Sequence, residues 1–232
     1  MQVSAVLVAA GSSTRMGFDK LSFDLGGETV LRRSIRAFEQ CPLVDEIVLV
    51  AGKNRAYVEA QAKDCRKPVQ VVQGGATRAE SAKNGVLAAR GAFVAVHDAA
   101  RPFVSEAVIA DAIAAAKRCG AAAPAVPVKD TVKRAVRGDG KTVPADCRVE
   151  DTPDRSTLFA VQTPQVFQAN ILKAALQSAL AAGAALTDDC SAVERLGKDV
   201  YLTPGWRENI KITTPEDLSV AEAFLRRRGD AQ

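Results

Sequence analysis

Apolar runs and amphipathic stretches alternate along the first half of the chain. Residues 3–10, VSAVLVAA, form a continuous apolar run that is typical of a strand covered on both faces. Residues 28–40 instead place apolar side chains at helical spacing. The same alternation predicts further strands at 46–51, 69–73, 92–97 and 121–126, and further helices at 55–65, 78–90 and 106–118. This repeated order predicts an α/β fold whose mostly parallel sheet carries helices on both faces.

The pattern changes after the fifth predicted strand, where charges become frequent and large apolar residues become few. Residues 129–136 and 141–149 have the pattern of two strands, and RGDG at 137–140 is a turn signal between them. We expect a β-hairpin arm at about 129–156 that projects from the core, and a homodimer built through this arm. The remaining elements complete a single domain over residues 1–232: helices at 169–182, 188–196 and 215–227, and a strand near 200–202.

The amino-acid composition and the net charge narrow the classes of function that the protein can have. The content of 47% hydrophobic and 25% charged residues is ordinary for a globular protein, and the net charge of +4 suits an anionic substrate without indicating nucleic-acid binding. The cysteines are scattered with no CxxC pair, so we expect reduced thiols rather than disulfides or a zinc site. The first apolar run is far shorter than the ~20 residues that cross a bilayer, and no signal-peptide pattern is present. We therefore expect a cytoplasmic protein that binds neither nucleic acid nor membrane.

The loop after the first predicted strand combines small residues with two cations. It consists of AAGSSTRMG at 9–17 followed by FDK at 18–20. Ligands of open α/β sheets bind at the carboxyl ends of strands, and small residues there let backbone N–H groups approach phosphate oxygens. The charges of Arg15 and Lys20 fit a triphosphate better than a sugar. The loop matches neither GxGxxG nor GxxxxGK[ST]. A plain turn with two solvated cations is the alternative interpretation.

A second group of polar residues ends the strand predicted at 92–97, where the sequence continues as HDAARP. Asp98 is placed to contact a nucleotide or a phosphate-bound Mg²⁺, which prefers oxygen ligands, and Arg101 can fork onto an anion. The alternative is that Asp98 only caps the following helix. His97 is the only histidine. Because it ends a buried strand, we interpret it as a hydrogen-bonded structural residue rather than a proton shuttle.

Several segments, taken in order, resemble one family. They are the loop at 9–20, GGATRAES at 74–81, VHDAARPF at 96–103, KDTVKR at 129–134, QTPQVF at 162–167, TDD at 187–189 and ENIKITTPEDL at 208–218. Each motif alone is weak, but the ordered set is similar to that of the 2-C-methyl-D-erythritol 4-phosphate cytidylyltransferases from about residue 3 to residue 225. The resemblance implies a Rossmann-like fold, a homodimer with exchanged arms, Mg²⁺, and transfer of CMP from CTP to methylerythritol phosphate with release of pyrophosphate.

The resemblance also implies roles for individual residues. Those that would hold the cytidine are Ala10, Gly11, Gly75 and Ser81. Those that would stabilise charge on the reacting phosphates are Arg15, Lys20 and Lys211. Those that would lie between the ribose, the metal and the second substrate are Asp98, Ala99 and Arg101, with Thr163 completing the floor of the site. Those that would reach the methylerythritol phosphate bound mainly by the other subunit are Thr131 and Arg155.

Two positions depart from the pattern of the family. Asp19 precedes Lys20 where the family usually has proline, in a loop about two residues shorter. Ala76 replaces the usual acidic residue after Gly-Gly, so one cytosine contact would be missing or would come from Thr77 or the backbone.

The implied reaction needs no protein nucleophile. A phosphate monoester is already anionic at pH 7, because its second pKa is near 6, and it can attack the α-phosphorus in line once cations neutralise the approaching charges. The nearest competing function keeps CTP but transfers CMP to another acceptor, such as ribitol 5-phosphate. A nicotinamide-dependent oxidoreductase and a non-catalytic nucleotide sensor are more distant competitors. The missing GxGxxG motif counts against the oxidoreductase, and the presence of Arg15 and Lys20 counts against the sensor.

Overall fold

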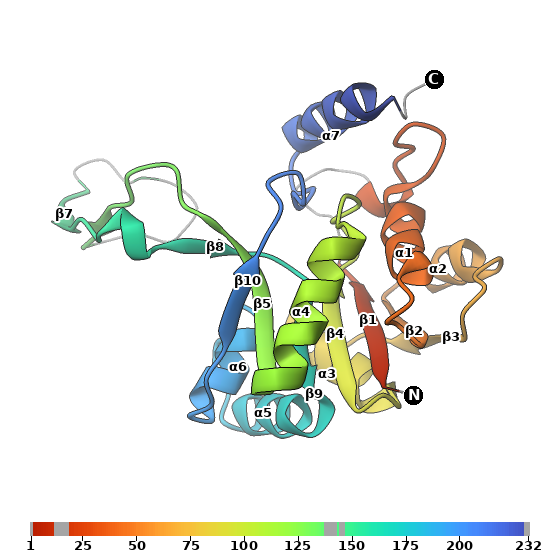
Figure 1. The fold of residues 1–232 in the computed structure, drawn as a ribbon, viewed down its shortest axis with the longest axis horizontal. Coiled ribbons are helices and arrows are strands. Elements are labelled where there is room, and N and C mark those ends of the chain that lie inside the picture. Colours follow the sequence, from red (N-terminus) through yellow and green to blue (C-terminus); the bar gives the residue numbers. More distant parts are fainter. Residues whose placement is uncertain (1, 12–18, 137–142, 144–146, 230–232) are drawn as a thin grey trace.

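The computed structural model describes residues 2–11, 19–136, 143 and 147–229, which are organised around a central sheet (Figure 1). Its main strands are β1 (Val3–Ala9), β2 (Glu46–Ala51), β3 (Val69–Gln73), β4 (Phe93–Asp98), β5 (Ala121–Pro127), β9 (Gln165–Gln168) and β10 (Tyr201–Pro204). They lie in the order β10-β5-β9-β4-β1-β2-β3. Only β9 on this path is antiparallel to its neighbours, β4 and β5. The predicted mostly parallel α/β sheet is confirmed.

Helices cover both faces of this sheet. One face carries α1 (Val30–Gln40), α2 (Arg55–Ala62) and α4 (Glu106–Cys119). The other carries α3 (Arg78–Ala88), α5 (Ala169–Ala181) and α6 (Asp189–Arg195). The last helix, α7 (Pro215–Arg228), lies above the carboxyl ends of the strands at the top of Figure 1. Within the described part of the chain, no helix has the length and apolar character needed to span a membrane.

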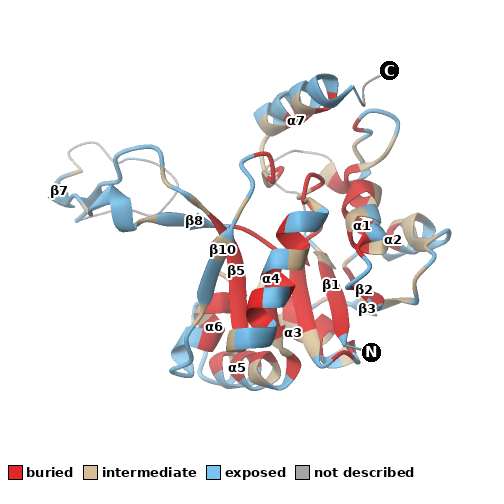
Figure 2. Cartoon of the chain, in the orientation of Figure 1, coloured by how far each residue is buried: buried red, intermediate tan, exposed pale blue. Residues whose placement is uncertain are grey.

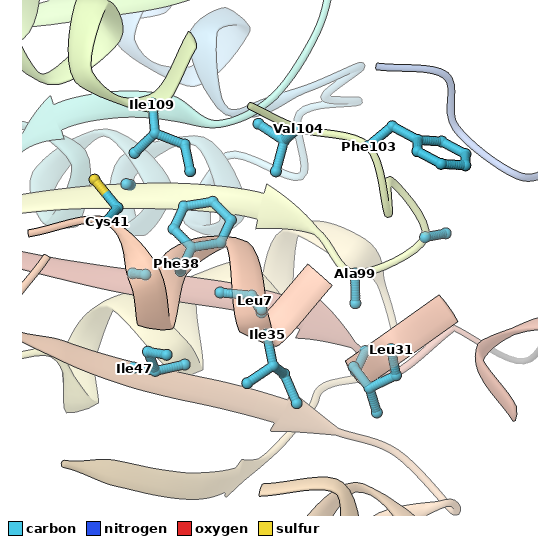
Figure 3. Packing of buried hydrophobic residues seen from close by; sticks show 14 of the residues in the cluster. Leu7, Leu31, Ile35, Phe38, Cys41, Ile47, Ala99, Phe103, Val104 and Ile109 are labelled. Carbon is cyan, nitrogen blue, oxygen red and sulfur yellow. The ribbon is translucent and has the colours of Figure 1, made fainter. Parts of the chain in front are cut away.

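Alternate side chains of each strand supply the two apolar layers, because neighbouring residues of a strand point to opposite faces. Leu7 and Ile47 pack with Ile35 and Phe38 of α1 on one face (Figure 3). Val6 packs with Val48 and Val96 of the adjacent strands against α3 and α5 on the other. Figure 2 shows the buried residues concentrated in the sheet and in the helix surfaces that face it. Burial on both faces explains why the first strand is apolar except for Ser4, whose hydroxyl donates to the buried Glu46.

Capping residues fix where the helices near the strand ends begin. Thr77 and Glu80 form a capping box at the start of α3, and Ser105 accepts a hydrogen bond from Val108 at the start of α4. Capping boxes also begin α6, with Asp188 and Ser191, and α7, with Thr214 and Asp217. These caps hold the first turns of α3 and α7 beside the loops that carry the candidate site residues.

Two short strands and the extent of the arm differ from the sequence prediction. β8 (Phe159–Val161) and β9 were not predicted, because strands of three or four residues leave too little alternation to detect. The arm does form a hairpin, but β6 (Arg134–Ala135) and β7 (Val149–Asp151) pair over only a few residues. The predicted turn at 137–140 lies outside the described residues. A short 3₁₀ helix, η2 (Arg155–Thr157), follows β7 in the arm, and β8 then leads back to the central sheet (Figure 1).

Candidate functional site

The candidate site lies where the strand order reverses. β1 neighbours β2 on one side and β4 on the other, and ligands of open α/β sheets bind at such switch points. The loops after β1, β2 and β3 meet closely here. A Cβ added to Gly52 would lie 2.9 Å from the Ala10 carbonyl oxygen, and one added to Gly74 would lie 2.6 Å from the Ala10 Cβ. Gly11, in contrast, has nothing within 4 Å of an added Cβ, so the space beside it is open.

The segment between β3 and α3 is folded back on itself. The Gly75 N–H donates to the Ser81 hydroxyl at 3.1 Å, and that hydroxyl donates to the Thr77 carbonyl at 2.9 Å. A side chain at Gly75 would collide with Glu80. The structure therefore brings together Gly75, in the loop between β3 and α3, and Ser81, in the first turns of α3, with the backbone of Gly75 exposed and the Ser81 side chain buried.

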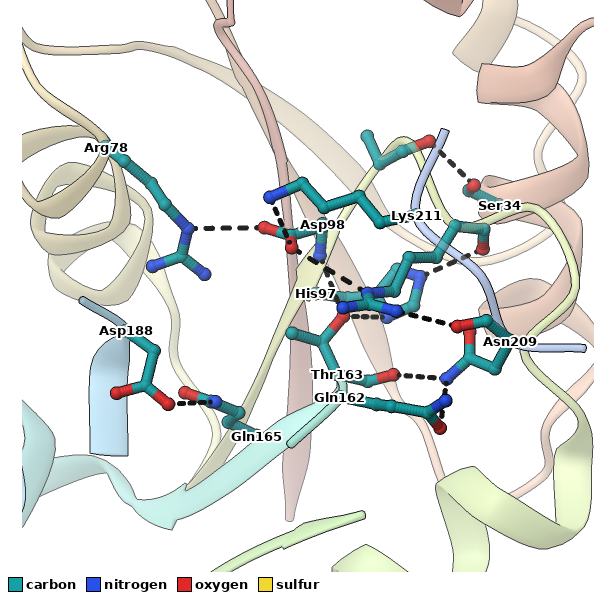
Figure 4. A network of polar contacts seen from close by, with 12 residues as sticks. Ser34, Arg78, His97, Asp98, Gln162, Thr163, Gln165, Asp188, Asn209 and Lys211 are labelled. Atoms are coloured by element: carbon teal, nitrogen blue, oxygen red, sulfur yellow. Dashed lines mark hydrogen bonds and ion pairs between the residues drawn. The ribbon is translucent and has the colours of Figure 1, made fainter. Parts of the chain in front are cut away.

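Asp98, at the carboxyl end of β4, is the centre of the charged network in Figure 4. Its Oδ1 lies 3.2 Å from Arg78 Nε, and its Oδ2 lies 2.9 Å from Lys211 Nζ and 3.8 Å from Arg101 Nε. Arg78 also pairs with the buried Asp189 at 3.0 Å. The structure thus brings Asp98, Arg101 and Lys211 together, as predicted. It also shows that Asp98 does not act as a simple helix cap.

Electrostatics keep this network ionised. Burial alone would raise the pKa of Asp98, but the charges of Arg78 and Lys211 outweigh it and hold that pKa below its usual range. Burial disfavours the charged form of Arg78, yet Asp189 and Asp98 raise its pKa above the ordinary value. Asp98 and Arg78 are therefore held in their charged forms, whereas burial raises the pKa of Asp189 despite its pairing with Arg78.

His97 is a buried structural residue, as the sequence predicted. Burial lowers its pKa to about 3, so the ring is neutral at neutral pH. Its Nε2 lies 3.2 Å from the Arg101 carbonyl oxygen and must carry the proton, so its Nδ1 accepts from the Thr163 hydroxyl at 2.9 Å. The Thr163 oxygen in turn accepts from the Asp98 N–H at 3.1 Å. This chain of hydrogen bonds fixes the backbone of Asp98.

A loop before α7 brings Lys211 to Asp98. The Arg101 guanidinium donates to the Asn209 carbonyl at 2.6 Å, and the Asn209 amide donates to the Thr163 carbonyl at 2.9 Å. Ile212 donates its N–H to the Ala100 carbonyl at 2.9 Å. Buried Asn209 therefore links the loop to both the β4 and the β9 segments, which positions the lysine ammonium. The sequence did not single out Asn209, because its role depends on contacts between distant segments.

The structure describes two of the three other predicted residues of this region, Ala99 and Lys20. Ala99 is buried, and its N–H and C=O are engaged by the Val8 carbonyl and the Ser34 hydroxyl (Figure 4). Lys20 begins the short helix η1 (Lys20–Ser22), which Asp19 caps by accepting from the Leu21 N–H. Arg15, also predicted to contact phosphates, lies outside the described residues.

The arm residues lie apart from this network. The Arg155 guanidinium donates to the Lys129 carbonyl at 2.6 Å, two residues from Thr131, and all three residues are exposed. Figure 1 shows the arm projecting away from the carboxyl ends of the central strands. Arg155 is thus bonded to the segment that contains Thr131, and the arm lies apart from Asp98 of the same chain.

The residues present do not form a protein cage for a metal. Among the described residues, no group of three or more His, Cys, Asp or Glu side chains is placed to hold an ion. Both Asp98 oxygens already face cations, so a divalent ion bound there would compete with Arg78 and Lys211 for the same carboxylate. The donor set therefore fits Asp98 as a partner of cations from the protein better than as a metal ligand.

Arg78 and Asp189 are the main site residues that sequence reasoning missed. Arg78 lies one residue after the Thr77 cap. The sequence feature that could have indicated Arg78 as a site residue is therefore a cation in the first turn of a helix that follows a strand. Asp189 lies in the TDD segment at 187–189, but its contact with Arg78 spans 111 positions of the sequence. No local pattern indicates that pairing.

Comparison with known proteins agrees with this geometry. The family model described as 2-C-methyl-D-erythritol 4-phosphate cytidylyltransferase matches residues 3–227. The enzyme of that name from Caldanaerobacter subterraneus is 43% identical, with the match covering 98% of this chain and 100% of that protein. A bifunctional enzyme IspD/IspF from Anaeromyxobacter sp. is 44% identical over 97% of this chain, which spans only 57% of that longer relative.

Solved structures give the same result. The crystal structure of 4-diphosphocytidyl-2C-methyl-D-erythritol synthase from Anaerococcus prevotii matches with a TM-score of 0.85 and 32% identity, covering 97% of this chain and 96% of that one. The bifunctional IspDF from Campylobacter jejuni matches with a TM-score of 0.76 and 27% identity, covering 94% of this chain and 54% of that one. The chain belongs to the 2-C-methyl-D-erythritol 4-phosphate cytidylyltransferase family.

Proposed function

We propose that the protein transfers CMP from CTP to 2-C-methyl-D-erythritol 4-phosphate and releases pyrophosphate. The observation that carries this proposal is the arrangement of Arg78, Arg101 and Lys211 around Asp98. They lie at the carboxyl end of β4, at the switch point of the sheet, where the close-packed loops after β1 and β3 also lie. Family membership supplies the identity of the two substrates.

The nucleophile in this proposal is a phosphate oxygen of the acceptor. A phosphate monoester is already anionic at neutral pH, so no side chain has to remove a proton. This agrees with the site, whose one histidine is buried, neutral and held by two hydrogen bonds. The acceptor oxygen attacks the α-phosphorus in line, the bond to the β-phosphate oxygen breaks, and pyrophosphate leaves.

Charge neutralisation and positioning are the tasks left to the protein. Lys211, with 36% of its side chain exposed, can face both Asp98 and a phosphate. We propose that Lys211, Lys20 and Arg15 stabilise the negative charge that develops as the two anions approach. The cytidine would lie over Ala10, Gly11, Gly75 and Ser81, with Asp98, Ala99, Arg101 and Thr163 supporting the ribose and the acceptor.

Mg²⁺ completes the proposed charge balance. Because both Asp98 oxygens face cations, we propose that the ion is held mainly by the CTP phosphates, with Asp98 at most a secondary ligand. Bound there, it would supply further neutralisation of the triphosphate.

We also propose a homodimer formed through the arm. Large apolar side chains are exposed along this part of the chain and the adjacent sheet edge, namely Val132, Val136, Phe159, Val161, Tyr201, Leu202 and Trp206. Surfaces of this kind favour a protein partner. A second copy of the chain would cover them, and its Thr131 and Arg155 would contact the phosphate of the acceptor.

Release of pyrophosphate tests the proposal. The protein is incubated with Mg²⁺, CTP and either methylerythritol phosphate or ribitol 5-phosphate, and pyrophosphate is measured with a coupled assay. We expect release with CTP and methylerythritol phosphate, and little release with ATP, GTP or UTP. Equal or faster turnover with ribitol 5-phosphate would reassign the acceptor, and no release with any pair would refute the proposed reaction.

A further inference from the structure

Arg78 lies between two carboxylates from distant parts of the chain. Its Nε is 3.2 Å from Asp98 Oδ1, and one terminal nitrogen is 3.0 Å from Asp189 Oδ2. The planar guanidinium can satisfy two carboxylates at once only in a narrow range of orientations. The two contacts together therefore fix the direction in which Arg78 faces the site.

Asp189 is itself fixed from the sheet side. The carbonyl oxygen of the buried Gln165 side chain accepts from the N–H groups of Asp189 and Cys190 at 3.0 and 3.1 Å. The Gln165 amide donates to Asp188 at 2.7 Å (Figure 4). Gln165 lies opposite Val96 in the pairing of β9 with β4, two residues before Asp98. The strand pair that carries Asp98 therefore also sets the position of Asp189.

Asp189 is the second of the two carboxylates that pair with Arg78. Arg78 shares Asp98 with Arg101 and Lys211, and Asp189 gives it a second carboxylate, so without Asp189 the shared Asp98 would be its remaining carboxylate in this network. The side chain of Asp189 is only 1% exposed and cannot reach a substrate directly. The contact of its side chain that leads toward the site is the ion pair with Arg78.

We propose that Asp189 is a positioning residue, which orients Arg78 beside the loop of Gly75 and Ser81 and so prepares the CTP side of the site. The inference rests on the proposed function, because that function places the nucleotide over this loop. It predicts a selective effect. Loss of Asp189 should weaken the use of CTP and leave the acceptor, bound through the arm, largely unaffected.

The first test replaces Asp189 without changing its shape. In Asp189→Asn we expect the KM for CTP to rise about 10-fold, the scale of one lost charge-assisted hydrogen bond, while the KM for methylerythritol phosphate stays within about 2-fold. Glu194→Gln removes an exposed acid from the same helix and is the matched control, for which we expect both KM values to be unchanged. Equal increases of both KM values in Asp189→Asn, or none, would overturn the inference.

A second set of variants protects the test against misfolding of Asp189→Asn. Arg78→Lys keeps a cation for Asp98 and the buried Asp189 and is expected to fold, and Arg78→Gln keeps a hydrogen-bond donor there; each should raise the KM for CTP about 10-fold or more, with folding checked by circular dichroism. Adding Asp189→Asn to Arg78→Gln should cause no further increase if Asp189 acts through Arg78. A multiplicative increase in the double variant, or a normal KM in Arg78→Lys, would contradict the proposal. An inactive wild-type protein would instead refute the proposed function itself.

Discussion

Two regions of the molecule illustrate two ways of building a site: the arm, and the group of residues around Asp98 at the carboxyl ends of the central strands, here called the rim. At the rim, Asp98, His97, Thr163 and Asn209 are each less than a tenth exposed and are held by contacts within the chain. In the arm, every residue of β6, β7 and the adjoining β8 is exposed. The rim is therefore preorganised in a single chain, whereas the exposed surface of the arm is what we expect of an element that pairs with the proposed second copy.

Burial explains why the two regions differ. A carboxylate at a strand end is costly to bury unless cations and hydrogen-bond donors surround it, so the rim needs many convergent contacts. The arm has no such requirement, because its charges are solvated. Rim residues should consequently act within their own chain, and arm residues should act on the site of the other subunit.

Removing Lys211 should have the largest effect. In Lys211→Ala we expect kcat for pyrophosphate release to fall about 10²–10³-fold, because one cation aimed at the reacting phosphates is lost. Lys198→Ala, at an exposed position after α6, is the control and should keep normal kcat. A kcat within about 3-fold of the wild type in Lys211→Ala would show that the rim does not carry the catalytic charge.

Removing Arg155 should sharpen the distinction between rim and arm. In Arg155→Ala we expect the KM for methylerythritol phosphate to rise up to about 100-fold and that for CTP to change little, because a bidentate phosphate contact is lost. Equal effects on both substrates would contradict this assignment.

A mixed dimer can show which subunit the arm serves. Arg155→Ala and Lys211→Ala chains are co-expressed with different tags, and the mixed dimer is purified. If the arm acts on the partner, one of the two sites contains both native residues, and about half of the wild-type activity should return. If the arm acts within its own chain, both sites stay defective and no activity returns.

The smallest effect concerns stability rather than turnover. The folded protein holds His97 with a pKa of about 3, whereas the unfolded chain has the ordinary value of 6.5. As pH falls below 6.5 the unfolded chain gains a proton that the folded protein excludes, so stability is lost toward pH 3. Between pH 7 and pH 5 we expect His97 to reduce the unfolding free energy by about 2 kcal/mol.

Urea unfolding of the wild type and of His97→Gln at both pH values measures this contribution. The wild type should lose about 2 kcal/mol more than the variant between the two conditions. Identical pH dependence in the two proteins would show that His97 is not held neutral in the fold.

Much of the fold follows from local pattern. The apolar runs at β1, β2 and β4 are long enough to reveal buried strands, and the helices have clear periodicity and caps. β8 and β9 were missed because they are short and are stabilised by long-range pairing with β4 and β5. The strand that carries Gln165 thus had no local signal of its own.

The site was predictable only in part. Asp98 and Arg101 follow a recognisable strand end, whereas the assignment of Lys211 came from the order of motifs along the chain. The contacts of Arg78 with Asp189 and of Arg101 with Asn209 join segments more than a hundred positions apart. Contacts of that kind depend on how the sheet brings strand ends together, and no sequence window contains them.

A crystal structure of the protein with CTP and Mg²⁺ tests the central claim most directly. The account predicts the triphosphate within hydrogen-bonding distance of Lys211 Nζ, and the base over the Gly75–Ser81 loop. A nucleotide bound at another face of the sheet, with Lys211 still paired only to Asp98, would contradict it.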